Sequence, residues 1–219
     1  IFIVMLKIAF NQSYIYPLEE NHRFPMIKYE LIPEQLIREN TCVNDNFFNP
    51  GKIDKKLVLL THQEEYFDRF KSLKLSKKEI REIGFPLSKE LVEREMEIAQ
   101  GTVMGVNYSL KNGISMNIAG GTHHAFFDRG EAFCMLNDQS IAANYLLKEK
   151  LVKKIMIIDL DVHQGNGTAS IFKRNNNVFT LSFHGKKNYP FRKEISDLDI
   201  EFEDNTNDNE YLAVLKKTI

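Results

Sequence analysis

Short apolar segments alternate with longer stretches of helical periodicity along the chain. Apolar runs predict strands at residues 1–10, 114–119, 155–159 and 178–183. A short helical pattern at 168–173 separates the last two, and a strand, a helix and a strand so close together imply a right-handed parallel crossover. We therefore predict a single α/β domain over residues 1–219, with a mainly parallel sheet flanked by helices.

Periodicity and capping signals place the helices. Ser76 and Glu79 form a capping box, Ser88 begins the longest helix, and Thr61 with Glu64 suggests another helix start. Pro33 should break or kink the first helix. The expected helices cover residues 26–40, 65–70, 76–84, 88–111, 136–150, 168–173 and 210–217. The acidic stretch 194–210 has few apolar residues and is expected to form a surface excursion.

Composition narrows the functional classes. The chain has 219 residues, 43% of them hydrophobic and 27% charged, with a net charge of -1. Nothing in this balance indicates direct binding of nucleic acid or an anionic membrane. No run approaches the roughly 18 apolar residues of a membrane span, and the first ten residues lack a secretory signal, so we expect a cytoplasmic protein. Two cysteines, Cys42 and Cys134, suit a reducing compartment.

Polar residues follow the apolar run at 155–158 in an alternating pattern. Asp159, Asp161 and His163 are spaced two apart, so an extended strand would place all three side chains on one face. A carboxylate and an imidazole two residues apart are natural ligands for one divalent metal of the zinc kind. The simpler interpretation is a strand that ends in capping and turn residues.

Tandem histidines, His123 and His124, follow a pair of glycines after the strand predicted at 114–119. Sites in open α/β sheets gather beyond the carboxyl ends of strands, so this loop and the turn at His163 can meet. A metal with two nearby imidazoles suggests hydrolysis by a metal-activated water, with a histidine taking and returning the proton. Asp159 or Asn166 could accept a ring N–H and fix a tautomer. The alternative is a pair of loop histidines without a catalytic role.

Three blocks of sequence resemble the histone deacetylase superfamily in order and spacing. They are GTHHA at 121–125, GEAFCMLND at 130–138 and DLDVHQGNGT at 159–168. The segment HRFPMIKY at 22–29 and the asparagine at 166 resemble the class IV branch and its bacterial relatives. The likeness runs from about residue 7 to the end of the chain. It implies the three-layer αβα architecture shared by deacetylases and arginase.

The resemblance also implies roles for individual residues. Asp161 and His163 match two of three metal ligands, for zinc or ferrous iron. His124 matches a general base, and His123 matches its electrostatic or acid partner. Asn166 stands where some members have an aspartate behind the second histidine, and a neutral partner should raise the basicity of that histidine less.

Further positions match supporting parts of the family's site. Asp159 matches the carboxylate that supports the first histidine and, with Ser182, helps to hold a monovalent cation such as potassium. Phe133 matches one aromatic wall of an acyl-lysine tunnel, and Tyr189 is a candidate for the opposite wall. Phe133 beside Cys134 could equally be an ordinary core residue.

Two parts of the family's site have no counterpart in the sequence. The third metal ligand, an aspartate, and an oxyanion-stabilising tyrosine come in the family from segments beyond the position of Ile219. The 219 residues therefore resemble the front two-thirds of such an enzyme. Two protein ligands alone would hold zinc poorly, and loss of one oxyanion donor can cost roughly 10²–10³ in rate.

Four functions fit these observations. The first is a zinc-dependent amidohydrolase that removes acetyl or longer acyl groups from lysine side chains. The second keeps this chemistry but acts on an acetylated polyamine or another small amide, which acidic groups in 194–210 would favour. The third is an arginase-like hydrolase with two manganese ions, against which the tandem histidines argue. The fourth is a truncated binding module without a competent metal.

Overall fold

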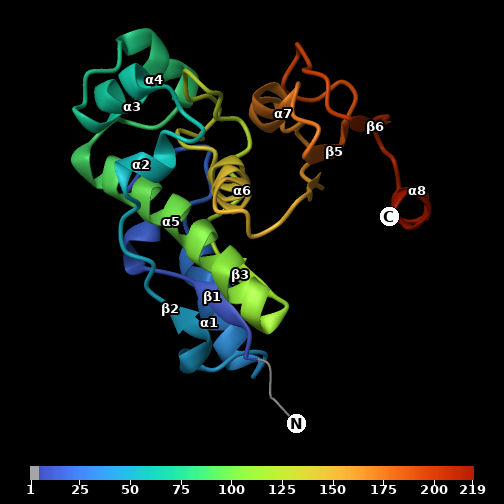
Figure 1. The fold of residues 1–219 in the computed structure, drawn as a ribbon, viewed down its shortest axis with the longest axis horizontal. Helices are drawn as coiled ribbons and strands as arrows, with labels where there is room; N and C mark the ends of the chain where they lie inside the picture. Colours follow the sequence, from blue (N-terminus) through green and yellow to red (C-terminus); the bar gives the residue numbers. More distant parts are fainter. Residues whose placement is uncertain (1–4) are drawn as a thin grey trace.

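Parallel strands form two small sheets in the computed structural model, which describes residues 5–219 (Figure 1). The first sheet has the order β2-β1-β3 and the second has the order β4-β5-β6, with every pairing parallel. The strands are β1 (Lys7–Ala9), β2 (Phe47–Phe48), β3 (Ser115–Asn117), β4 (Ile155–Asp159), β5 (Val178–Gly185) and β6 (Leu198–Phe202). The parallel α/β class agrees with the prediction, but the strands divide into two sheets. Residues 1–4 of the predicted first strand lie outside the described residues.

Helices pack around both sheets. They are α1 (Lys28–Arg38), α2 (Lys55–Val58), α3 (Glu64–Lys71), α4 (Lys77–Ile83), α5 (Lys89–Asn112), α6 (Asp138–Lys148), α7 (Asn166–Phe172) and α8 (Asp208–Thr218), with short 3₁₀ turns η1 (Gln12–Tyr14) and η2 (Asn44–Asn46). Within the described part of the chain, no helix combines the length and the apolar character needed to cross a bilayer.

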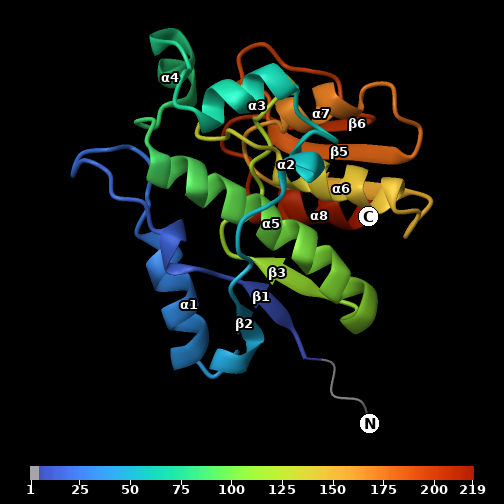
Figure 2. The same cartoon turned by 60° about the vertical axis from the view of Figure 1, so that its left-hand side comes forward.

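Helix α5 is the central element of the larger half of the molecule. The Ser88 side chain accepts a hydrogen bond from Leu91 N at its start, and Gly113 ends it with a φ of 81°. One face of α5 packs on β1 and β3, and α6 lies alongside it (Figure 2). The predicted extent of this helix is confirmed to within a residue at each end.

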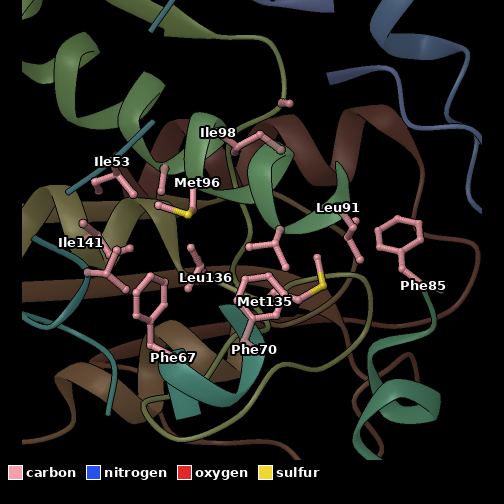
Figure 3. Packing of buried hydrophobic residues seen from close by; sticks show 14 of the residues in the cluster. Ile53, Phe67, Phe70, Phe85, Leu91, Met96, Ile98, Met135, Leu136 and Ile141 are labelled. Atoms are coloured by element: carbon pink, nitrogen blue, oxygen red, sulfur yellow. The ribbon is translucent and has the colours of Figure 1, made fainter. Parts of the chain in front are cut away.

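Two apolar clusters hold the elements together. The larger one joins α3, α5 and the segment before α6; Figure 3 labels Ile53, Phe67, Phe70, Phe85, Leu91, Met96, Ile98, Met135, Leu136 and Ile141 from it. The smaller one packs α6 and α7 on the second sheet through Ala143, Ile157, Phe172 and Val178. In the smaller cluster strands and helices both contribute, so burial of apolar surface holds β4 and β5 against α6 and α7.

Three of the expected local features differ in the structure. Helix α1 is not broken at Pro33, which lies inside it and is buried. Thr61 does not cap α3, which begins after Gln63, because the buried Thr61 hydroxyl accepts a hydrogen bond of 2.9 Å from Asn144 Nδ2 instead. The acidic stretch contains a sheet strand, β6, and Asp197 there accepts hydrogen bonds from both the backbone N and the hydroxyl of Thr180.

Candidate catalytic site

The tandem histidines lie on the loop that follows β3, and both are buried. The Asp138 carboxylate, in the first turn of α6, accepts hydrogen bonds from Gly121 N at 3.1 Å and from Thr122 N at 2.8 Å. The Thr122 hydroxyl donates to it as well, at 2.6 Å. These contacts fix the loop, and they bring the ring centroids of His123 and His124 to 4.0 Å.

His123 has a charged partner. Its Nδ1 lies 2.5 Å from Asp159 Oδ2 at the end of β4. Burial lowers the pKa of His123, but the hydrogen bond and the charge of Asp159 outweigh it, so that the pKa is raised. Gly165 permits this approach, since a Cβ there would lie 2.3 Å from Asp159 Oδ2. The predicted meeting of the two loops is thereby confirmed.

His124 has a neutral partner. Its Nδ1 lies 2.7 Å from Asn166 Oδ1 at the start of α7. Burial lowers the pKa of His124 to about 3, and a positive charge on His123 adds to this effect, while the hydrogen bond with Asn166 opposes it only in part. The two neighbouring imidazoles are therefore driven to opposite protonation states, His123 toward the charged form and His124 toward the neutral one.

Asp161 and His163 converge through a turn, whereas the sequence suggested a continuous strand. Strand β4 ends at Asp159, whose Oδ1 accepts a hydrogen bond from Asp161 N at 3.0 Å. Asp161 Oδ1 in turn accepts from His163 N at 2.7 Å and lies 2.8 Å from His163 Nδ1. These side-chain-to-backbone bonds compete with extension of the strand. The side chains of Asp161 and His163 stay 51% and 40% exposed, so their donor atoms remain accessible.

The donor atoms of this turn suit a divalent metal of the zinc or ferrous kind. A carboxylate oxygen, Asp161 Oδ1, and an imidazole nitrogen, His163 Nδ1, are both typical ligands. The charges of His123 and His163 and the hydrogen bond from His163 N outweigh burial and lower the pKa of Asp161, which favours the ligating carboxylate. Residues 5–219 contain no group of three or more His, Cys, Asp or Glu side chains arranged to hold a metal. Asp161 and His163 therefore fit as two ligands of a larger set.

The two predicted tunnel residues lie in different surroundings. The ring of Tyr189 is 5.1 Å from that of His124, nearly perpendicular to it, and 6.1 Å from that of His163. The ring of Phe133 packs on Phe24 at 5.1 Å and on Phe85 at 5.0 Å. Tyr189 thus borders the histidines directly, whereas Phe133 belongs to an aromatic cluster with the segment before α1 and the segment after α4.

The predicted cation residues are neighbours across the second sheet. Asp159 in β4 is paired in register with Ser182 in β5, so their side chains leave the same face. The Ser182 hydroxyl lies 3.0 Å from Nδ1 of the buried His184. The structure thus brings the two predicted residues together, with His184 as a third neighbour.

Sequence reasoning gave no role to two acidic residues that support this site. Asp138 holds the histidine loop, and Glu131 accepts hydrogen bonds from the Tyr189 hydroxyl and from Asn166 Nδ2, the latter at 3.3 Å. Asp138 could be recognised as an acidic first-turn residue of a helix. No local signal identifies Glu131, because its partners are 35 and 58 residues away in the sequence.

Sequence similarity to known proteins extends over nearly the whole chain. A sequence model of the histone deacetylase domain matches residues 18–219. An uncharacterised protein of Picosynechococcus is 37% identical over 208 residues, with 95% of this chain and 69% of that protein covered. Histone deacetylase 2 of Arabidopsis thaliana is 26% identical, with 98% and 58% covered. The acetoin utilization protein AcuC of Staphylococcus aureus is 28% identical, with 80% and 48% covered.

Solved structures share the fold. The crystal structure of an HDAC homolog from Aquifex aeolicus matches 97% of this chain and 63% of its own, with a TM-score of 0.81 and 25% identity. An HDAC homolog complexed with SAHA matches the same shares with a TM-score of 0.81 and 26% identity. The predicted αβα architecture is confirmed. The chain spans less than two thirds of the length of these structures.

Proposed function

Because the chain belongs to the histone deacetylase family, we propose that its histidine site hydrolyses acyl amides, with an acylated lysine side chain as the leading substrate. The observation that supports this most directly is the pair of opposed imidazoles beside two accessible metal donors. His123 is paired with a carboxylate and His124 with a neutral amide. The ring of His163, which is hydrogen-bonded to Asp161, lies 5.9 Å from that of His124.

The two histidines take different roles in this proposal. A general base must be unprotonated at the working pH, and the pKa of His124, lowered to about 3, keeps it so. A base with so low a pKa accepts protons weakly, so His124 acts best on a strongly acidified donor. His123 is held toward the imidazolium by Asp159, and it stabilises negative charge that develops on the substrate. Titrating groups with pKa values pushed apart are typical of acid–base catalysis.

A divalent ion is part of the proposal. Asp161 and His163 would hold zinc or ferrous iron together with at least one ligand beyond those that residues 5–219 bring to this turn. When bound, such an ion polarises the scissile carbonyl and acidifies water. Asp159 and Ser182, adjacent in the second sheet, would hold a monovalent cation such as potassium.

The acidic stretch gives little support to an acetylated polyamine as the substrate. Asp197 accepts hydrogen bonds from Thr180, and Asp199 accepts one of 2.9 Å from Gln164 Nε2. Glu203 lies 2.9 Å from Lys186 Nζ. Since these carboxylates already have partners within the protein, we place acyl-lysine first and keep the polyamine as the other arm of the test.

The test compares acetate release from acetyl-lysine peptides and from acetylpolyamine by the protein in the form its own cells make. We expect the peptide to be turned over faster. His163→Ala and Asp161→Asn should abolish turnover of the peptide, while Asp204→Asn, which removes an exposed carboxylate beyond β6, should leave it unchanged. Full activity in the first two variants would refute this assignment of the site.

A further inference from the structure

Glu131 lies on the loop before α6 and contacts two residues that border the histidines. Its Oε1 accepts a hydrogen bond from the Tyr189 hydroxyl and one of 3.3 Å from Asn166 Nδ2. Its Oε2 lies 3.7 Å from Arg129 Nε, and 24% of the side chain is exposed. An ionised carboxylate only accepts hydrogen bonds, so both Tyr189 and Asn166 must donate to it.

This requirement fixes the orientation of the Asn166 amide. Amide oxygen and nitrogen can exchange places unless their partners distinguish them. Here Nδ2 is committed to Glu131, and Oδ1 faces His124 Nδ1 at 2.7 Å and Gly167 N at 3.0 Å. Asn166 is only 2% exposed, so an amide nitrogen without Glu131 would lose its acceptor in a buried site.

The orientation of the amide determines the tautomer of His124. The amide oxygen that faces Nδ1 can only accept a hydrogen bond, so Nδ1 of the neutral His124 carries the hydrogen and Nε2 keeps its lone pair. Polarisation along the hydrogen-bonded chain from Glu131 through Asn166 strengthens the acceptor. A carboxylate thus acts on both histidines: Asp159 is hydrogen-bonded to His123 directly, and Glu131 acts on His124 through Asn166.

We propose that Glu131 is a positioning residue that sets the tautomer of His124 through Asn166 and holds Tyr189 beside the histidines. The expected effect of Glu131 on catalysis rests on the proposed function, whereas its effect on the His124 tautomer does not. The hydroxyl of Tyr189 is engaged by Glu131, so this residue presents its ring, 5.1 Å from that of His124. Tyr189 therefore lines the site and is not its oxyanion donor.

Nitrogen NMR of protein labelled at histidine tests the tautomer without any assay of activity. Wild-type protein should show His124 protonated at Nδ1 alone. Glu131→Leu removes the acceptor and should give a mixture of tautomers. Asp128→Asn is the matched control, because it removes a carboxylate from the same loop whose ion pair within residues 5–219 is with Arg129, and it should leave the wild-type spectrum unchanged. An unchanged His124 signal in Glu131→Leu overturns the proposal.

A double substitution separates positioning from a merely structural role. Glu131→Leu should lower kcat about 10- to 100-fold with little change in KM, and Glu131→Gln, which keeps an acceptor oxygen, should lower it less. In an Asn166→Asp background two carboxylates would face each other, so Glu131→Gln should then raise kcat. Equal losses from Glu131→Gln in both backgrounds would contradict the inference. If wild-type protein turns over no acyl amide, the proposed function fails and the NMR result alone decides the role of Glu131.

Discussion

Single partners give the adjacent histidines their different behaviour. His123 and His124 share a loop, are similarly buried and lie 4.0 Å apart. Burial lowers the pKa of both imidazoles, but the carboxylate of Asp159 outweighs it at His123, whereas the amide of Asn166 does not at His124, so the two pKa values move in opposite directions. The sequence predicts all four residues, because they fall in motifs with regular spacing. It does not predict Glu131 or Asp138, whose partners are distant in the chain.

His62, which lies between α2 and α3, is fully buried. Its Nε2 accepts a hydrogen bond from Asn137 N at 2.9 Å, and its Nδ1 lies 2.9 Å from Phe126 O. Burial lowers the pKa of His62 to about 4, against about 6.5 in an unfolded chain. The unfolded state therefore binds a proton before the folded state does. Stability should fall between about pH 6.5 and about pH 4, by about 3 kcal/mol in total.

Urea unfolding of wild type and His62→Gln near pH 7 and near pH 5 measures this contribution. The loss of stability between the two pH values should be smaller in the variant by about 2 kcal/mol. Glu95 acts with the opposite sign, since burial raises its pKa to about 7, but it is present in both proteins and cancels in the comparison. An equal pH dependence in the two proteins would contradict the role given to His62.

Helix α5 packs so closely on its neighbours that replacing one of its glycines should lower stability, the opposite of the usual effect in a helix. Replacing glycine by alanine inside a helix normally stabilises it by about 1 kcal/mol. At Gly101 a Cβ would lie 2.7 Å from Tyr14 Oη and 2.9 Å from Asn117 Nδ2. We expect Gly101→Ala to destabilise the protein by about 1–3 kcal/mol.

Gly105, one turn later on the same helix, provides the control. Its nearest contact for a Cβ is Ser115 Oγ at 3.0 Å, a single side-chain atom. Gly105→Ala should therefore change the free energy of unfolding by no more than about 1 kcal/mol. Denaturant unfolding of both variants gives the ranking, and a Gly101→Ala protein at least as stable as wild type would show that this face of α5 is not tightly packed.

The helices that sequence patterns predict best are those whose ends are set by residues within a few positions of each end. Capping residues and periodicity place α4 and α5 closely, since Ser76, Ser88 and the glycines after each helix act within a few residues. The extent of β4 and the existence of β6 depend instead on distant hydrogen bonds. Asp159 ends one strand by accepting from Asp161 N, and Asp197 accepts from Thr180 next to the other.

At the scale of the molecule, the site lies where the two halves of the fold meet. The histidine loop follows the first sheet, and the segment from Asp159 to Asn166 follows a strand of the second. The side chain of Asn137 joins them, since its Nδ2 donates to Ala125 O at 3.1 Å and to Thr168 Oγ1 at 3.0 Å. The parallel topology predicts that such loops gather at one edge. The division into two sheets has no local signature and could not be predicted.

Metal-dependent hydrolysis is the central claim, and removal of the metal tests it most directly. Acetate release from an acetyl-lysine peptide should be measured on the protein as its cells make it, before chelation, after chelation, and after addition of zinc or ferrous iron. We expect wild-type activity to disappear with the chelator and to return with the metal, and Asp161→Asn to stay inactive throughout. Turnover that persists in the metal-free protein, or metal-loaded wild type that releases no acetate, would contradict the account.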